Sequence, residues 1–304
     1  MLRLPSRLRC LSRSLCASAS PPAPLPPAPL RRGDYTPPAF LVPRMSLEFD
    51  LDPSSTTVRS RLHLSRAPLG SGDLVLDGIE RYVSLQSLRL GGCPDGPADR
   101  VLSASDYVQE AERLVIPARL LPPGDADFVL EADVELCPKE NLSMAGLYMD
   151  GGGSFMTQCE AEGFRQITFG LDRPDVLTVF QVRLTADRKA CPVLLSNGNL
   201  VGEGEGEGAA DHSNSRHSTF WEDPFPKPSY LFAVVAGDLG RLESTFTTMS
   251  GADVDLAIYS EPKNVGSLVR GRIRGRTEEK MREEDLLYAC VWRREEREKN
   301  QPLC

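Results

Sequence analysis

The 304-residue chain lacks any long hydrophobic run. Its longest apolar stretches, such as residues 230–236, are far shorter than the roughly 20 apolar residues that a helix needs to cross a bilayer. Basic residues are also few relative to acidic ones: 35 Lys and Arg face 43 Asp and Glu, which gives a net charge of -8. The sequence therefore predicts no membrane span and no general nucleic-acid-binding surface.

Histidine is rare, and the common catalytic motifs are missing. Only His63, His212 and His217 occur, and none stands in H-E-x-x-H, where helical spacing directs two imidazoles to one zinc ion. His212 and His217 follow a glycine-rich run with no third ligand near them in sequence, so we expect a solvated loop there. His63 alternates with Leu62 and Leu64 on an expected strand and is interpreted as an outward-facing or hydrogen-bonded polar residue. No G-x-S-x-G motif is present, so the chain offers neither a catalytic residue nor a metal site.

The sequence also lacks the features of a secreted protein. Its eight cysteines form no C-x-x-C pair and are too sparse for a disulfide scaffold, so we expect free thiols in a reducing compartment. The N-terminus has no uninterrupted apolar segment of the kind that a secretory signal needs. The formal glycosylation acceptor Asn141-Leu142-Ser143 is therefore interpreted as a chance match.

Residues 202–208 alternate glycine and glutamate. A phosphate-binding loop needs backbone N–H groups together with a lysine or a helix N-terminus, whereas three carboxylates would repel an anion. We interpret this run as an acidic hairpin tip.

Residues 1–33 differ from the rest of the chain in charge. They hold six arginines and no Asp or Glu, and all 43 acidic residues follow them. Arg- and Ser-rich N-termini without acidic residues are typical of organelle transit peptides, and the proline-rich run at 21–29 is typical of a linker. We therefore expect a leader over 1–33 and localisation in the mitochondrion or plastid. The alternative is a disordered tail without a targeting function, on a cytoplasmic protein.

The body of the chain has the pattern of β-strands. Short apolar or alternating stretches, separated by Gly and Pro, occur at 45–51, 58–64, 74–76, 83–90, 114–116, 128–136, 180–184, 230–235 and 254–258. The first two stretches flank Pro53-Ser54-Ser55 and predict a hairpin. Because many short strands must each bury one face against a second layer, we expect an antiparallel all-β domain of sandwich or saddle type.

One central segment alternates polar and small residues and reads T-Q-C-E-A-E-G-F-R. Extended backbone would place Gln158, Glu160 and Glu162 on one face, where an amide oxygen and two carboxylates could hold an ammonium group. The alternative is a water-facing strand on which one of the carboxylates pairs with Arg165 or Arg173.

The same segment, with L-D-R-P-D-V-L at 171–177, resembles the N-terminal domain of zinc aminopeptidases of the aminopeptidase N family, bacterial type. Further motifs of this family occur in the same order: D-Y-x-P at 34–37, L-S-N-G-N at 195–199, D-P-F-P-K-P at 223–228, Y-L-F-A at 230–233, V-A-G-D at 235–238 and T-F-T-T at 245–248. The resemblance covers residues 34–268.

The resemblance implies a saddle-shaped β domain that packs against a thermolysin-like catalytic domain and contributes to its cleft. It implies that Gln158 and Glu160 grip the free α-amino group of a peptide substrate, because an exopeptidase must distinguish a terminal ammonium from an internal amide. It also suggests that Glu162, Arg165 and residues 172–175 position the strand and the turn that follows.

The chain departs from the family in its missing catalytic motifs. Family catalysis requires G-A-M-E-N, H-E-x-x-H with a downstream Glu as zinc ligand, and a Tyr that stabilises the transition state, and the sequence has none of these. Residues 269–304 are rich in Glu and Arg, resemble nothing in the family, and could form a solvated helix over 277–299.

We therefore expect an aminopeptidase N-terminal domain that recognises a peptide N-terminus, binds no zinc itself and is inactive alone. The alternatives are a non-catalytic β-sandwich interaction module and a truncated gene model of an active enzyme.

Overall fold

The computed structural model describes residues 31–68, 70–92, 100–124, 126–205, 216–251, 253–266 and 290–293. Most of the predicted leader, His212, the end of the glycine–glutamate run and nearly all of the 269–304 tail lie outside these residues. The chain divides into two compact units, Met1–Thr36 and Pro37–Cys304. In the first unit, the described residues form the short 3-10 helix η1 (Arg32–Asp34), and the Asp34 carboxylate accepts a hydrogen bond from the backbone N–H of Arg31 at 2.8 Å.

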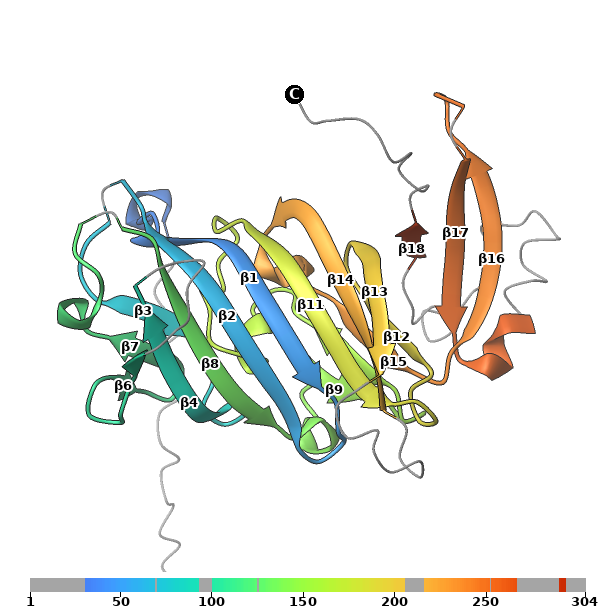
Figure 1. Ribbon diagram of the computed structural model, residues 1–304, viewed down its shortest axis with the longest axis horizontal. Coiled ribbons are helices and arrows are strands. Elements are labelled where there is room, and N and C mark those ends of the chain that lie inside the picture. Colours follow the sequence, from blue (N-terminus) through green and yellow to red (C-terminus); the bar gives the residue numbers. More distant parts are fainter. Residues whose placement is uncertain are drawn as a thin grey trace, which may run out of the picture. The chain divides into compact units, whose positions relative to one another are not determined.

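The second unit is built on an eight-stranded sheet with the order β13-β14-β11-β1-β2-β8-β4-β5 (Figure 1). Its strands are β1 (Phe40–Asp50), β2 (Thr56–Arg66), β4 (Ser84–Gly91), β5 (Arg100–Val101), β8 (Phe128–Leu136), β11 (Thr178–Asp187), β13 (Asn199–Glu205) and β14 (Arg216–Lys227). The predicted all-β class is confirmed, and so is the hairpin around Pro53, which is formed by β1 and β2.

Three smaller sheets accompany the large one. The first contains β12 (Val193–Ser196), β15 (Val234–Gly237), β10 (Phe155–Gln158) and β9 (Gly146–Met149); the second, β3 (Leu74–Asp77), β7 (Arg113–Ile116) and β6 (Val108–Gln109); the third, β16 (Gly240–Thr247), β17 (Asp253–Ser260) and β18 (Cys290–Arg293). Single 3-10 turns connect several strands: η2 (Ala118–Leu120), η3 (Pro138–Glu140), η4 (Phe164–Gln166) and η5 (Ser229–Leu231).

Several pairings in the large sheet depart from a simple antiparallel meander. β1 and β11 pair in parallel, whereas the other strand pairs that the structure describes are antiparallel. Parallel neighbours cannot be joined by a tight turn, so everything from β2 to β10 forms the crossover between them. The β1–β2 register also shifts between Leu41 and Arg44, where Pro43 has no N–H to donate.

A cluster of aromatic rings joins the four-stranded sheet to the large sheet. The ring of Phe232, which lies just before β15, has its centroid 5.4 Å from that of Phe164 in η4, 5.4 Å from that of Phe180 in β11 and 6.1 Å from that of Phe49 in β1. All four side chains are buried. Because η4 is held in this core, the turn that precedes it has a fixed base.

Two predicted elements differ from the structure. The strand expected at 230–235 begins instead as the 3-10 turn η5, and strand structure starts only at Val234. The helix considered over 277–299 is contradicted at 290–293, which form β18, and the rest of that range lies outside the described residues. None of the helices that the structure describes combines the length and the hydropathy needed to cross a membrane.

Candidate functional site

The segment predicted to grip an amine lies at the end of β10. This strand pairs with β9 on one side and β15 on the other, and it ends at Gln158. The prediction of extended backbone on to Arg165 is wrong, because residues 160–163 form a turn that is closed by a hydrogen bond of 2.8 Å from the N–H of Gly163 to the carbonyl oxygen of Cys159. Glycine is required at 163, since a Cβ there would overlap the carbonyl oxygen of Gln158.

The turn still exposes both predicted grip residues. Gln158 and Glu160 are exposed while Cys159 between them is buried, so the alternation of the strand continues for one residue beyond its end. The amide Nε2 of Gln158 donates a hydrogen bond to the backbone oxygen of Glu160 at 3.3 Å. Burial also raises the pKa of the Cys159 thiol, which keeps this side chain neutral beneath the turn.

Glu160 lines a surface hollow of about 330 Å³. Glu112 and Glu162 line the same hollow, and Arg165 is the basic residue among its described lining. Gln158 does not line it. Within the part of the chain that the structure describes, no ion pair or side-chain hydrogen bond engages the Glu160 carboxylate. The arrangement therefore offers a carboxylate to a cationic group that approaches from solvent.

Glu162 has a different environment from Glu160. Its carboxylate lies 3.5 Å from the guanidinium of Arg165, although its side chain remains 71% exposed. Arg173 instead pairs with Asp175 at 2.7 Å. Of the alternative prediction, the ion pair is present between Glu162 and Arg165, but it lies on a turn and not on a water-facing strand.

Beneath the turn, Arg165 is held by a buried carboxylate. Its Nε lies 3.0 Å from Oδ2 of Asp172, its Nη2 donates to the backbone oxygen of Asp172 at 3.0 Å, and the side chain of Asp172 is 1% exposed. Burial alone would lower the pKa of Arg165, but the hydrogen bond to Asp172 and the attraction of Asp77 and Asp172 raise it. Ser229 donates its hydroxyl to the other oxygen of Asp172.

Asp77 extends this network to the end of β3. Its Oδ2 accepts the backbone N–H of Asp172 at 3.0 Å, and burial raises the pKa of its carboxyl, partly offset by the attraction of Arg165. Sequence reasoning identified neither Asp77 nor Glu112 as part of this region. No local pattern could have identified them, because both lie more than 40 residues before the turn.

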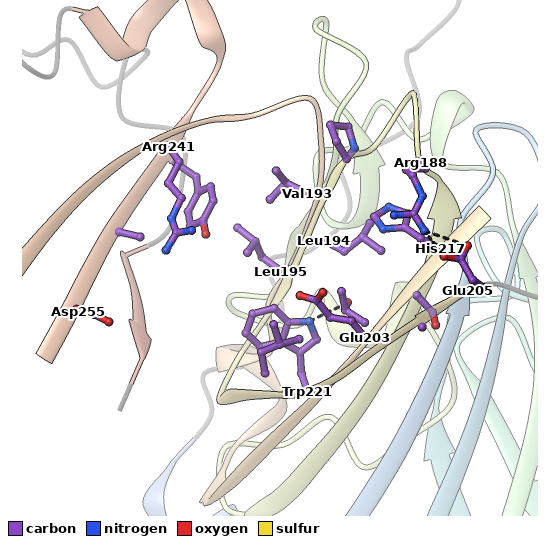
Figure 2. A pocket seen from close by; sticks show the side chains of 17 residues that line it. Arg188, Val193, Leu194, Leu195, Glu203, Glu205, His217, Trp221, Arg241 and Asp255 are labelled. Atoms are coloured by element: carbon purple, nitrogen blue, oxygen red, sulfur yellow. Dashed lines mark hydrogen bonds and ion pairs between the residues drawn. The ribbon is translucent and has the colours of Figure 1, made fainter. Parts of the chain in front are cut away.

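A larger cavity of about 540 Å³ lies elsewhere in the second unit (Figure 2). Leu194, Leu195 and Trp221 form part of its apolar wall. Arg188 and Glu205 also line the cavity and form an ion pair of 3.0 Å. The described lining of this cavity includes neither Gln158 nor Glu160. Because the predicted residues do not line this cavity, its larger volume is no reason to place amine recognition there.

His217 also lines the larger cavity, contrary to the prediction of a solvated loop at this position. The residue is buried in β14, and its Nε2 lies 2.7 Å from the carbonyl oxygen of Cys191. The prediction was wrong because β14 already begins at Arg216, so the strand directs the imidazole inward. His212 lies outside the described residues.

The glycosylation motif at Asn141 serves a structural purpose. The Nδ2 atom that would carry a glycan donates to the carbonyl oxygens of Ala145 at 2.8 Å and Leu147 at 2.9 Å, and the side chain is buried. Its oxygen accepts hydrogen bonds from the backbone and hydroxyl of Ser143. The amide therefore closes the loop before β9.

A zinc ion does not fit the described part of this chain. Among those residues, no three His, Cys, Asp or Glu side chains come together in a way that could hold a metal ion. Cys137, Cys159 and Cys191 are free thiols, and the latter two are buried.

Comparison with known proteins gives a consistent picture. Residues 107–231 match the family model of the peptidase M1 N-terminal domain. Aminopeptidase N of Caulobacter vibrioides is 46% identical over 236 residues, which are 78% of this chain and 25% of that protein. Aminopeptidase N of Haemophilus influenzae is 43% identical over 234 residues, 77% of this chain and 25% of that protein. The chain thus spans about a quarter of the length of these relatives.

Solved structures of aminopeptidases are also similar to this chain in fold. Aminopeptidase A of Legionella pneumophila, in complex with aspartic acid, has a TM-score of 0.67 and 31% identity over 77% of this chain and 25% of that chain. The M1 zinc metallopeptidase of Deinococcus radiodurans has a TM-score of 0.56 at 15% identity, over 74% of this chain and 48% of that chain, and shows the common fold.

Proposed function

Because the chain carries an N-terminal domain of the peptidase M1, aminopeptidase N family, we propose that its site recognises the free α-amino group of a peptide. The Glu160 carboxylate accepts hydrogen bonds from the ammonium group, and the amide oxygen of Gln158 accepts a further one. The observation that carries this proposal is the exposed Glu160 carboxylate, which lines a hollow with two further glutamates and has no ion-pair partner among the described residues.

The physical basis is the difference between a terminal ammonium and an internal amide. A carboxylate forms charge-assisted hydrogen bonds with the ammonium, and these are roughly twice as strong as neutral ones. Gln158 can turn its oxygen towards the same group, because its Nε2 already donates to the backbone of Glu160. A blocked N-terminus carries no charge, so it would form only the weaker neutral hydrogen bonds with these acceptors.

We propose that peptide hydrolysis requires a catalytic domain that these 304 residues do not encode. In the family, zinc supplies an activated water and polarises the scissile carbonyl. The sequence has no H-E-x-x-H, and zinc finds no fitting group among the described residues. The part of this chain in the reaction is therefore to bind and orient the substrate N-terminus.

The first test measures binding by the chain itself. Alanine amide and N-acetyl-alanine amide are titrated into labelled protein, and backbone amide chemical shifts are followed by NMR. We expect alanine amide to move the resonances of Glu160, Ala161 and Gly163, and the acetylated compound to leave them in place. Glu160→Gln should abolish the response, whereas Glu48→Gln, an exposed carboxylate on β1, should not. Equal shifts with both compounds would contradict the proposal.

The second test restores a catalytic domain. Residues 34–268 replace the matching segment of the Caulobacter vibrioides aminopeptidase N, and hydrolysis of an alanyl fluorogenic substrate is measured. Glu160→Ala should lower kcat/KM by about 10- to 100-fold, since hydrogen bonds to charged groups contribute about 1.5–3 kcal/mol. Glu162→Ala is the matched control, because Glu162 is paired with Arg165. An unchanged kcat/KM for Glu160→Ala would exclude the grip.

We further propose that residues 1–33 direct the chain to the mitochondrion or plastid. The support is their charge, six arginines without an acidic residue. A fluorescent protein carrying these residues should colocalise with an organelle marker, and the same fusion with its arginines changed to glutamine should not. Diffuse cytoplasmic fluorescence of the first fusion would contradict this assignment.

A further inference from the structure

The hairpin of β16 and β17 has two outer edges, one along each strand. Its two strands pair over eight facing positions, from Gly240 opposite Ser260 to Thr247 opposite Asp253. β16 contains no buried residue, and in β17 only Val254, Ala257 and Ser260 are buried. A two-stranded hairpin with so little buried surface is marginally stable in water, and its outer N–H and C=O groups can pair with any extended chain.

The structure places a segment of the C-terminal tail on one of these edges. β18 (Cys290–Arg293) lies beside β17 and pairs antiparallel with it (Figure 1). In this register Cys290 is opposite Ile258 and Arg293 is opposite Asp255. β18 also contacts β13, at the edge of the eight-stranded sheet. At one end of this short ladder, the register puts the basic position 293 opposite the acidic position 255. Opposite charges at facing positions favour strand pairing.

The tail sequence independently favours a strand at this place. Residues 286–292 read Leu-Leu-Tyr-Ala-Cys-Val-Trp, an apolar run in a tail that is otherwise dominated by Arg and Glu. Tyr, Val and Trp are enriched in strands, and the flanking charges are typical of segments that pair within a chain rather than between chains. Register and composition thus point to the same four residues.

We propose that residues 290–293 are an intramolecular edge strand whose role is to occupy β17. The segment supplies the third strand of the small sheet and satisfies the outward backbone groups of β17. It thereby closes this edge to a second copy of the chain. This assignment is independent of amine recognition at Glu160.

Hydrogen exchange tests the assignment with a control inside β17. Successive N–H groups of a strand point to opposite sides, so alternate amides of β17 face β16 and β18. A chain that ends at Asp285 is compared with the full chain by residue-resolved NMR exchange, at a concentration where sedimentation velocity finds monomers. Amides that face β18 should exchange at least tenfold faster in the shortened chain, and those that face β16 should change less than twofold.

Two point variants avoid the truncation. Val291→Pro and Trp292→Pro remove neighbouring N–H groups, of which one faces β17 and the other faces away, and proline is tolerated where an edge strand faces solvent. One variant should therefore reproduce the exchange pattern of the shortened chain, and the other should resemble the full chain. A synthetic peptide of residues 286–297 should restore protection in the shortened chain, whereas a scrambled peptide should not.

Self-association gives a second readout. As its concentration rises, the shortened chain should form dimers in which the exposed β17 amides regain protection, whereas protection of the same amides in the full chain should not depend on concentration. Unchanged exchange of alternate β17 amides in the shortened chain and in both proline variants would overturn the proposal.

Discussion

Asp172 organises the turn that carries the candidate site. It lies almost fully buried and accepts hydrogen bonds from the backbone N–H and the Nε of Arg165, and from the hydroxyl of Ser229. A buried carboxylate is tolerated only when such donors compensate for its lost hydration. Each donor comes from a segment that must be in place before the network is complete, so these residues couple the turn to the rest of the fold.

Removal of Arg165 should therefore be costly. We expect Arg165→Ala to lower the free energy of unfolding by about 2–3 kcal/mol, because it leaves the Asp172 charge buried with fewer donors. Urea denaturation at neutral pH measures this value. Arg188→Ala is the matched control, since Arg188 pairs with Glu205 at the surface and exposed pairs contribute about 0–1 kcal/mol. Equal decreases in the free energy of unfolding of the two variants would show that the buried pair contributes no more to stability than the exposed pair.

Asp77 should make stability depend on pH. Because its pKa is raised in the folded protein, the folded state binds a proton at Asp77 more readily than the unfolded state. The resulting stabilisation is present below the ordinary pKa of 3.8 and is lost as pH rises through the folded value. Asp77→Asn should therefore be more destabilising, relative to the wild type, at pH 4 than at pH 7 in urea denaturation.

Asp106 provides a control of opposite sign. Hydrogen bonds from Ser103 lower the pKa of its carboxyl, so its stabilising effect is lost as pH falls. The destabilisation caused by Asp106→Asn should therefore persist from pH 7 to pH 4 and shrink only as the pH falls below the ordinary pKa of 3.8. The same pH trend for both variants would contradict the assignment of Asp77.

At the scale of elements, the candidate site depends on where β10 stops. The strand delivers Gln158 to the surface, and the tight turn after it then directs Glu160 into the hollow while Cys159 remains in the core. η4 anchors the far side of the turn through Phe164, which packs against Phe232. The turn is therefore fixed at one end by β10 and at the other by the packing of Phe164 in η4.

Gly163 is the position at which this element is most sensitive. Gly163→Ala should lower the free energy of unfolding by about 1–3 kcal/mol, since the added methyl group would overlap backbone atoms of Gln158 and Cys159. It should also weaken the response of the Glu160 amide to alanine amide. Gly151→Ala, where a Cβ would meet nothing within 4 Å, should change stability by less than about 0.5 kcal/mol in the same denaturation experiment. An unchanged free energy of unfolding for Gly163→Ala would contradict the predicted overlap between a Cβ at residue 163 and the backbone of Gln158.

At the scale of the whole molecule, the parallel pairing of β1 and β11 connects distant parts of the sequence. Arg44 faces Val179 and Asp50 faces Thr185, so one end of the second unit is held against a strand more than 120 residues later. The two strands are joined by the long crossover from β2 to β10, so their pairing is a contact between distant parts of the chain. The second unit should therefore unfold as one cooperative body.

The first 33 residues should be dispensable for this body. The second unit begins at Pro37, and its buried core begins at Phe40. A chain that starts at Asp34 should melt within about 2 °C of the full chain, which corresponds to less than about 1 kcal/mol for a domain of this size. Circular dichroism melting curves of the two chains measure the difference. A much lower melting temperature would show that the leader contributes to the fold.

Sequence patterns predicted part of the fold and part of the site. Alternating stretches such as 45–51 and 128–136 became β1 and β8, because period-2 hydrophobicity directly reports a strand with one buried face. β9, β12 and β16 were missed, since each is short or largely exposed and gives little periodic signal. Gln158 and Glu160 were predicted from a motif, and the structure places both at the surface.

The sequence by itself determined the β class, the resemblance to an aminopeptidase N-terminal domain and the candidates Gln158 and Glu160, since these depend on local alternation and on the order of motifs along the chain. Only the tertiary structure decided that β10 ends at Gln158 and that Asp77 supports Arg165 through Asp172. The physical reason is that the energies of buried charge and of close packing depend on neighbours in space, and those neighbours are far apart in the sequence.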